Sequence, residues 1–426
     1  MRLKIRVSMT VILCFLALLQ ANNAGAQFLQ YTPPGGPAEK PESRKEALER
    51  EVERARYHLG PVRVAPWASL HDIAFIRSLL SDGQRPPSDV NATVGAGFRA
   101  YLRNGRKVTW TGQVLPEYVW WNQQSERRQL NGRYLLGFYG YFNRLTLEVR
   151  AGREQQQQVV TPEVPVPVSV RSEAGEILAE LEVSKAIFAF AAASLTQQHN
   201  LVQDEPDPRT GELVLLDREE RITRGGLRWR PSRRWSVALG AERSEVDFDR
   251  GALDRSNSGT SPVAEVSYLG RRLGFQVNAA ARSLAARRGS DFVPYDKVTG
   301  KAAITLEPAG RLSGSLYASH DLVYSLFSSY AYLDDERVGV SAALGLGRRL
   351  QSRFFFERGT DTYTAFEAGT PRRQDDVTSY GASLKVTLTE RLSLSLQGLR
   401  SEFVADTPGG DRSYTSVGTT INFGGL

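Results

Sequence analysis

The stretch that decides the fold is Asp89–Trp121, DVNATVGAGFRAYLRNGRKVTWTGQVLPEYVWW. Apolar residues occupy every second position from Val90 to Leu102, and polar, small or amphipathic residues lie between them. Asn104-Gly105 then supplies the chemistry of a tight hairpin turn, and the alternation resumes on the way back. Strands of globular domains usually have about five or six residues, whereas a tilted strand needs about 9–11 to cross a bilayer. The stretch therefore predicts a transmembrane β-hairpin.

Short and long connections alternate along the rest of the chain. Short turns are predicted near 104–106, 143–144, 184–185, 231–234, 270–272, 308–310, 348–351 and 389–391. Longer polar segments are predicted at 122–131, 155–172, 197–217, 249–260, 283–296, 319–332, 359–376 and 402–412. With a first strand near Val62–Ile76 and a last near Tyr414–Gly424, the count is about eighteen. Sixteen stays open, because the strand boundaries in 177–196 and 320–336 are ambiguous.

These features predict an all-β fold in which residues 60–426 form one transmembrane antiparallel up-and-down β-barrel. An even strand number puts both barrel ends on the side of the short turns, which is periplasmic in bacterial outer-membrane barrels. Aromatic residues gather near strand ends, as the two interfacial girdles of such barrels require. They are Trp110, Phe142, Trp229 and Trp235 near short turns, and Tyr118, Trp120 and Tyr134 near long ones. A soluble β-protein is the competing interpretation.

The first 26 residues have the features of a secretory signal peptide. A basic segment is followed by an apolar run to about Leu19 and by Ala24-Gly25-Ala26, a cleavage-type site. The only cysteine, Cys14, lies inside this run, so the exported chain is expected to lack thiols, disulfides and thiolate metal sites. Loss of three basic residues from 54, against 47 acidic ones, leaves a net charge of +4, too mild to indicate nucleic acid.

Residues 27–59 are expected to form a periplasmic linker and helix. Ser43 and Glu46 match a capping box, and Leu48, Val52 and Ala55 fall on one helical face before Gly60-Pro61. One interpretation of residues 43–59 is a solvated spacer. The other is a helix that enters the lumen or docks a periplasmic partner.

Charged residues recur on the side of the strands opposite the apolar face. An arginine or lysine facing lipid would cost about 2–4 kcal/mol at the membrane midplane, so these residues are expected to face the lumen. The predicted pore-lining residues are basic Arg99, Arg103, Arg150, Arg228, Arg282, Lys301 and Lys385, and acidic Glu148, Glu180, Glu242, Glu265 and Glu307. They indicate either a pore for polar or anionic solutes or a lumen filled by ion pairs.

Enzymatic motifs are sparse. His58, His71, His199 and His320 have no metal-site spacing, and no catalytic residue, cofactor or metal is predicted. His320-Asp321 could orient a serine as in a barrel lipase, which keeps an enzyme as the less favoured alternative. Gln155–Gln158 and the prolines after it predict a long surface loop, with folding over the pore as one option.

Residues Glu53–Ile76, ERARYHLGPVRVAPWASLHDIAFI, combine a charged helix, Leu-Gly-Pro and an alternating strand. This segment resembles the opening of a porin-like family of outer-membrane β-barrel proteins associated with bacterial exopolysaccharide loci, and a weaker resemblance extends over residues 45–426. An eighteen-stranded barrel with basic inward residues is also similar in kind to the alginate exporter. The resemblance implies outer-membrane placement and a part in exopolysaccharide transport.

The expected function is therefore an outer-membrane channel for polar or anionic solutes, or a component of exopolysaccharide export. A structural, plugged or adhesive barrel is the alternative. The expected partners are outer-membrane lipid, the barrel assembly machinery, and a polysaccharide or small anionic solute. The chain departs from the usual aromatic C-terminus, since Phe423 is followed by Gly424-Gly425-Leu426.

Overall fold

The computed structural model describes residues 44–55, 57–79, 88–202, 208–249, 254–287, 289–347, 349–389 and 392–423. The signal peptide and linker predicted for residues 1–42, as well as Ser43 and Gly424–Leu426, lie outside these residues. Among the described residues, no helix combines the length and apolar content needed to cross a bilayer.

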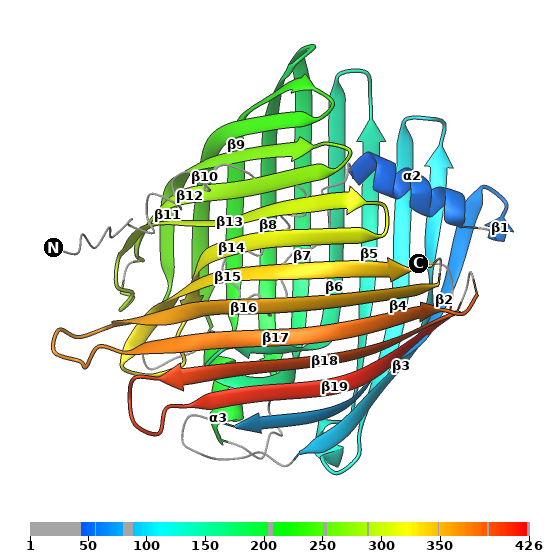
Figure 1. The fold of residues 1–426 in the computed structure, drawn as a ribbon. Helices are drawn as coiled ribbons and strands as arrows, with labels where there is room; N and C mark the ends of the chain where they lie inside the picture. The colour runs from blue at the N-terminus through cyan, green and yellow to red at the C-terminus, as the bar shows by residue number, and fades with distance from the viewer. Residues whose placement is uncertain are drawn as a thin grey trace, which may run out of the picture.

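Eighteen antiparallel strands form one closed barrel (Figure 1), which confirms the predicted fold class. Each strand pairs with the next in sequence, and β19 closes the ring on β2 over the register from Ser413 opposite Leu79 to Phe423 opposite Ala68. Closure leaves no open sheet edge, which lipid could not satisfy. The strands are β2 (Val62–Leu79), β3 (Asp89–Asn104), β4 (Val108–Trp121), β5 (Gln129–Tyr141), β6 (Leu145–Thr161), β7 (Val164–Ser184), β8 (Ile187–Leu201), β9 (Arg218–Ser232), β10 (Trp235–Phe248), β11 (Asn257–Leu269), β12 (Leu273–Ala286), β13 (Tyr295–Ala309), β14 (Leu312–Tyr324), β15 (Tyr330–Leu346), β16 (Leu350–Ala365), β17 (Gln374–Thr387), β18 (Leu392–Ala405) and β19 (Arg412–Phe423).

The eight short turns lie where the sequence predicts them, between β3 and β4 and then at every second connection. Gly105 has φ +66°, the left-handed conformation that its turn requires. The longer connections are shorter than predicted, because the strands continue into the polar segments: only 325–329 separates β14 from β15, and 406–411 separates β18 from β19.

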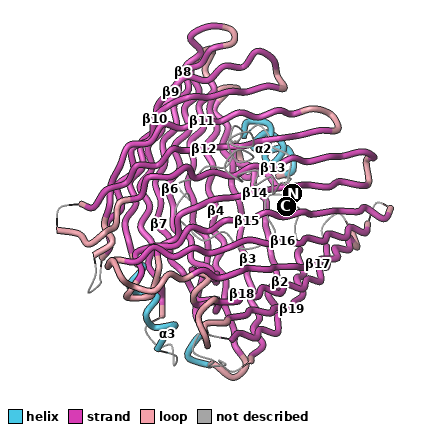
Figure 2. Tube along the Cα trace, turned by 60° about the vertical axis from the view of Figure 1, so that its left-hand side comes forward, coloured by secondary structure: helices cyan, strands magenta, loops and turns pink. Residues whose placement is uncertain are grey.

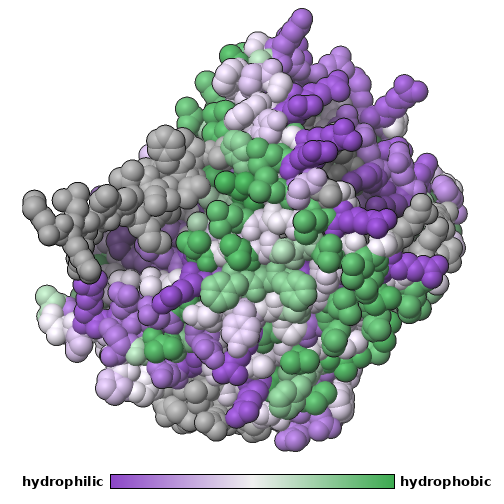
Figure 3. All heavy atoms as spheres, viewed as in Figure 1, coloured by the Kyte–Doolittle hydropathy of each residue, from purple (hydrophilic) through white to green (hydrophobic). Residues whose placement is uncertain are grey.

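The outer face of the barrel is apolar. In β3, Val90, Val94, Phe98 and Leu102 are 37–54% exposed, whereas the alternate residues Asp89, Asn91 and Thr93 are at most 3% exposed. A soluble protein would show the reverse, so this outer face is the surface that lipid covers. Figure 3 shows the resulting hydrophobic band across the middle of the molecule, with hydrophilic side chains gathered beyond it at the upper right, where short turns lie. The chain is an outer-membrane β-barrel.

Strand β2 contains an irregularity that the sequence analysis missed. Leu70 and Phe75 both face outward, although five positions separate them. Asp72 has φ +50° and lies at a register shift between β2 and β3. This β-bulge moves the outward face from even to odd positions.

The prediction of a long surface loop at 155–172 is wrong. β6 and β7 run through this segment as a hairpin, with only residues 162 and 163 between them. Residues 164–170 are buried on both faces, so the strand has no amphipathic alternation to reveal it.

The helices are short, and strands dominate the described chain (Figure 2). Helix α2 (Arg44–Arg54) lies at the end of the short turns, and α3 (Pro208–Gly211) lies at the other end in the connection after β8 (Figure 1). The helix predicted to reach Leu59 ends earlier, because β1 (Tyr57–Leu59) pairs with β2 through a turn at Gly60, which has φ +61°. Two 3-10 helices, η1 (Ser125–Arg127) and η2 (Glu212–Leu216), complete the fold.

Candidate functional site: the lumen of the barrel

Ion pairs between strands that are adjacent or one strand apart in the ring line the inner face of β7 to β12. Arg228 of β9 donates to Glu180 of β7 at 2.7 Å and to Glu265 of β11 at 3.0 Å. Arg230 donates to the same Glu180 at 2.6 Å. Four residues away from Arg228 on β9, Arg224 lies 2.5 Å from Glu242 of β10. Glu242 also lies 3.0 Å from Arg282 of β12. Each of these two shared carboxylates therefore holds two guanidinium groups.

In two pairs on the inner face, Arg230–Glu180 and Arg150–Glu176, the arginine is more exposed than the carboxylate, whereas Arg228 and Glu265 are equally exposed at 13%. The Arg230 side chain is 37% exposed and its partner Glu180 is 9% exposed. Arg150 is 38% exposed and its partner Glu176 is 17% exposed. At these two pairs a molecule passing along the wall therefore meets the guanidinium group first, while the carboxylate lies against the strands.

Around Glu242 the wall is tightly packed. A cavity of about 20 Å³ lies among Arg224, Glu242, Asn278, Arg282 and Thr299. This volume has room for about one water molecule. The cavity is therefore a packing gap in the wall and not a ligand pocket.

A second charge network covers the inner face of β13 to β19. Arg337 lies 2.6 Å from Asp335 and 2.7 Å from Asp361, and all three side chains are at most 7% exposed. Asp375 binds Arg412 at 2.7 Å and Arg373 at 3.1 Å. Lys301 lies 3.6 Å from Asp321. When one partner of such a buried pair is removed, the other is left as an uncompensated buried charge, which is strongly destabilising. These pairs therefore hold the strands that they join in a fixed arrangement.

The β6–β7 hairpin crosses the lumen above this network. Its backbone carbonyls accept hydrogen bonds from three other parts of the barrel: Pro162 from Arg412 of β19 at 2.9 Å, Pro165 from Ser78 of β2 at 3.0 Å, and Pro167 from Arg127 of η1. Arg412 and Ser78 belong to β19 and β2, which are not neighbours of β6 or β7 in the ring, and Arg127 belongs to the connection between β4 and β5. The hairpin is therefore an inward-folded element at the end of the long connections.

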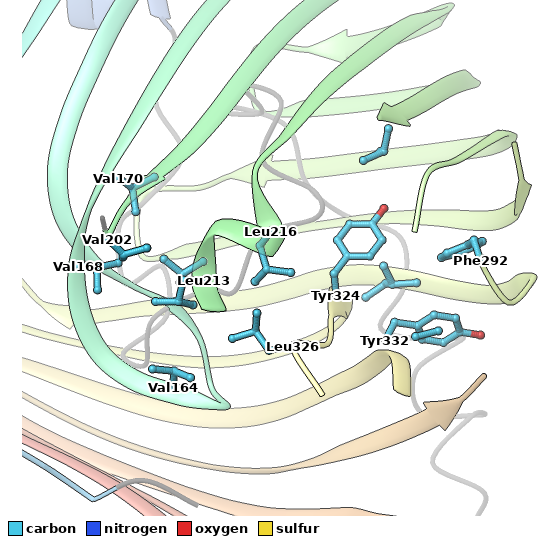
Figure 4. Packing of buried hydrophobic residues seen from close by; sticks show 14 of the residues in the cluster. Val164, Val168, Val170, Val202, Leu213, Leu216, Phe292, Tyr324, Leu326 and Tyr332 are labelled. Atoms are coloured by element: carbon cyan, nitrogen blue, oxygen red, sulfur yellow. The ribbon is translucent and has the colours of Figure 1, made fainter. Parts of the chain in front are cut away.

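An apolar cluster holds the hairpin in place (Figure 4). It joins the hairpin to the connection after β8, to the connection before β13 and to the ends of β14 and β15. Its members include Val164, Val168 and Val170 of the hairpin, Val202, Leu213 and Leu216 after β8, and Phe292, Tyr324, Leu326 and Tyr332. Burial of a valine side chain is worth about 1.5 kcal/mol or more. The cluster therefore stabilises the position of the hairpin inside the lumen by several kcal/mol.

The tip of the hairpin ends in a buried carboxylate. Glu163 is 1% exposed and accepts hydrogen bonds from the Ser325 hydroxyl at 2.6 Å and from the Leu326 N–H. Burial raises the pKa of the Glu163 carboxyl above its ordinary value, and these donors with the charges of Arg412 and Arg373 oppose that shift. A buried carboxyl that can titrate thus lies at the contact between the hairpin and the opposite wall.

Helix α2 lies against the inner face of β2 to β5 at the other end of the lumen. Leu48, Val52 and Ala55 are buried against Tyr101 and its neighbours Ala65, Tyr139 and Tyr141. The Tyr101 hydroxyl donates to Glu51 at 2.9 Å, and Arg99 lies 3.8 Å from Glu51. Of the two interpretations of this segment, the structure favours a helix that enters the lumen.

The structure places most of the predicted pore-lining residues in these networks. Arg99, Arg150, Arg228, Arg282 and Lys301 each face a carboxylate, and Glu180, Glu242 and Glu265 are among their partners. Glu148 is buried and Glu307 is half-buried. Arg103 and Lys385 are exposed near the ends of β3 and β17 that adjoin short turns.

Several site residues escaped sequence reasoning. His71 lies between Asp72, at 2.8 Å, and Glu117 of β4, at 3.1 Å, and it reaches them through the unpredicted bulge. Arg412 lies in the predicted loop 402–412, and Arg337 follows directly after 320–336, the segment whose strand boundaries the sequence leaves ambiguous. Asp72 interrupts the alternation of apolar and polar residues in β2, and this interruption was the signal in the sequence that could have predicted the bulge.

The histidines lie apart from one another. His320 contacts Asp334 at 3.3 Å, His199 lies 3.7 Å from Asp249, and His58 is on the exposed strand β1. No serine hydroxyl is hydrogen-bonded to a histidine in the described part of the chain. Over those same residues, no group of three or more histidine, cysteine, aspartate or glutamate side chains is placed to hold a metal ion.

No protein-family model and no curated protein matches the sequence. Among solved structures, Pseudomonas aeruginosa OpdQ superposes with a TM-score of 0.50 at 8% identity, covering 85% of this chain and 97% of that one. Acinetobacter baumannii OccAB3 gives 0.48 at 11% identity over 84% of this chain and 99% of that one. The FrpB iron transporter from Neisseria meningitidis (F5-1 variant) gives 0.43 at 9% identity over 81% of this chain, which spans 64% of that transporter's length. At these identities the likeness to OpdQ establishes the fold alone, an outer-membrane β-barrel that OpdQ shares with this chain.

Proposed function

We propose that this protein is an outer-membrane channel for small polar solutes with a preference for anions. The observation that carries the proposal is the exposure of the lumen pairs, in which Arg150 and Arg230 reach the lumen further than their carboxylate partners. About eighteen strands enclose an aqueous channel unless something fills it. Guanidinium groups along its wall raise the local potential and so attract anions.

The two elements inside the barrel limit what can pass. The β6–β7 hairpin narrows one end of the lumen and α2 occupies part of the other. Both features favour small solutes over a polymer. Export of exopolysaccharide, which the family resemblance implied, has no support in the comparisons.

A structural barrel closed by its own residues is the second candidate. The apolar cluster around the hairpin favours it, because Leu213 and Leu322 of this cluster are fully buried and the hairpin adds further apolar area. The two candidates differ in whether the wild-type barrel conducts.

Single-channel recording in planar bilayers tests the proposal. Wild-type protein should conduct, and its reversal potential in a salt gradient should indicate anion preference that weakens as salt rises. Deleting residues 160–168 should raise the conductance, whereas a matched deletion of residues 367–370, in an exposed connection, should not. Lack of conduction in both wild type and the 160–168 deletion would establish the structural candidate instead.

A further inference from the structure

The short turns carry a ring of exposed cations. In seven of the eight turns, at least one exposed arginine or lysine is described. We call these residues the basic rim; they are Arg106, Lys107, Arg144, Lys185, Arg233, Arg234, Arg271, Arg272, Arg311 and Arg349. The described residues of the eight turns include no aspartate or glutamate. The eighth turn carries Glu390 and Arg391, which lie outside the described residues.

Several rim cations have no carboxylate partner among the described residues. Lys107 donates to the neutral side chain of Asn143 at 3.0 Å. In the described part of the chain, no ion pair involves Arg144, Lys185, Arg234 or Arg311. On the outer face near the long connections, some cations are paired instead: Arg243 pairs with Glu245 at 2.8 Å and Arg400 with Glu402 at 2.6 Å. The end of the short turns, by contrast, combines exposed cations at seven turns with no acidic residue among the described turn residues.

The rim lies beside an outward-facing aromatic girdle. Trp110 packs on Phe138 with ring centroids 4.8 Å apart, three residues beyond Lys107. Trp235, which follows Arg234 directly, packs on Tyr268 at 4.9 Å and on Phe275 at 5.5 Å. Aromatic residues of outer-membrane barrels occupy the interface between hydrocarbon and headgroups. Cations one to three residues beyond them lie at the height of lipid phosphates.

We propose that the basic rim binds the headgroups of anionic phospholipids in the periplasmic leaflet. The cations occur at successive turns from the β3–β4 turn to the β15–β16 turn, so they follow the circumference of the barrel. A lipid annulus matches that distribution, whereas a protein partner would require cations on one side. The short turns are the periplasmic ones, which identifies the leaflet.

Lipid selection by the full-length barrel tests the proposal. The protein is reconstituted in nanodiscs of phosphatidylethanolamine and phosphatidylglycerol, and the phosphatidylglycerol retained after mild-detergent extraction is measured. Wild type should enrich this lipid, and a salt increase from about 0.05 to about 0.5 M should abolish the enrichment. Each cation near an anionic headgroup changes lipid partition by up to about fivefold, so removing several should cause a large loss.

The rim variant replaces Arg144, Lys185, Arg234, Arg272 and Arg311 with glutamine. Its control replaces the same number of outward cations near the long connections, Arg153, Arg221, Arg243, Arg358 and Arg400, so that the change in net charge is equal. Heat-modifiable gel migration verifies that both barrels are folded. Enrichment should fall in the rim variant and persist in the control.

Three results would overturn the proposal. The first is a wild type that shows no phosphatidylglycerol enrichment, which needs no variant to observe. The second is a rim variant whose enrichment equals that of wild type while its anion selectivity falls, because the rim would then act on permeating solutes. The third is a rim variant that enriches phosphatidylglycerol as wild type does but no longer binds sedimented peptidoglycan. That result would identify the cell wall as the partner of the basic rim.

Discussion

At the residue scale, the lumen is built from charges that neutralise one another. Arg228 lies between Glu180 and Glu265, and Glu180 also binds Arg230. The sequence predicts that these residues face inward, because alternation fixes the face of each strand position. The sequence does not predict which of these residues form ion pairs. Glu180 and Arg228 belong to different strands, and their distance depends on the register of those strands.

Replacing Arg228 with serine should shift the channel towards cations and destabilise the barrel. Glu265, whose side chain is 13% exposed, would lose the guanidinium that faces it. Removing one member of a buried pair typically costs about 3–5 kcal/mol. The reversal potential in a salt gradient and the urea midpoint of unfolding measure the two effects. The double variant Arg228→Ser with Glu265→Gln is the control, and it should recover most of both; failure to recover either would mean that the pair is not the cause.

Conductance should rise with pH through Glu163. Burial raises the pKa of this carboxyl when the hairpin is docked, so docking is most favourable below the ordinary carboxyl pKa and weakens as pH rises through the raised one. Wild-type conductance should therefore increase as pH rises above the ordinary carboxyl pKa of about 4. Glu163→Gln, which keeps the size of the side chain and stays neutral, should remain in the low-conductance state throughout. Equal pH slopes for the two proteins would exclude Glu163 as the titrating group.

At the scale of elements, the β6–β7 hairpin shows where sequence reasoning fails. A run of four glutamines and alternating prolines predicts a loop, yet the segment is a strand pair. β7 pairs with β8 only from Ser169 onward, so Pro165 and Pro167 lie on a free strand edge, where a missing N–H is tolerated. Burial of residues 164–170 on both faces removes the alternation that located the other strands.

Helix α2 was predicted as a helix, and entry into the lumen was one of two interpretations that the sequence left open. It could not decide between them, because the apolar stripe is narrow and the partners Tyr101 and Tyr139 are distant in sequence. Replacing Val52, which is fully buried, with aspartate should release the helix and raise the conductance, since an unpaired carboxylate is costly to bury. The barrel itself should still assemble, since its ring closes without α2. Glu49→Gln, at a half-exposed position on the same helix, is the matched control and should behave as wild type. Unchanged conductance in Val52→Asp, with protease access to the helix confirmed, would mean that α2 does not restrict the pore.

At the scale of the whole molecule, the sequence predicted about eighteen strands, with sixteen left open, and the position of every short turn. Both depend on local chemistry, namely alternation with period two and turn residues, which lipid enforces around the full ring. The elements that fold into the lumen follow no such rule. Water, backbone groups and charged side chains in the lumen can provide hydrogen-bond and ion-pair partners for many different arrangements of the chain.

The placement of the barrel in lipid makes a residue-by-residue prediction along β3. The only cysteine is Cys14, in the expected signal peptide, so single cysteines introduced into the exported chain provide unique labelling sites. A lipid-soluble thiol reagent should label cysteines at Val90, Val94 and Phe98, which face outward. It should not label cysteines at Asn91 and Thr93, which are at most 3% exposed. Cysteine at Arg103, exposed beside the first short turn, should instead react with a water-soluble reagent added from the periplasmic side. Labelling that does not alternate between neighbouring positions would contradict the assignment of the apolar face to lipid, whatever the conductance of the barrel.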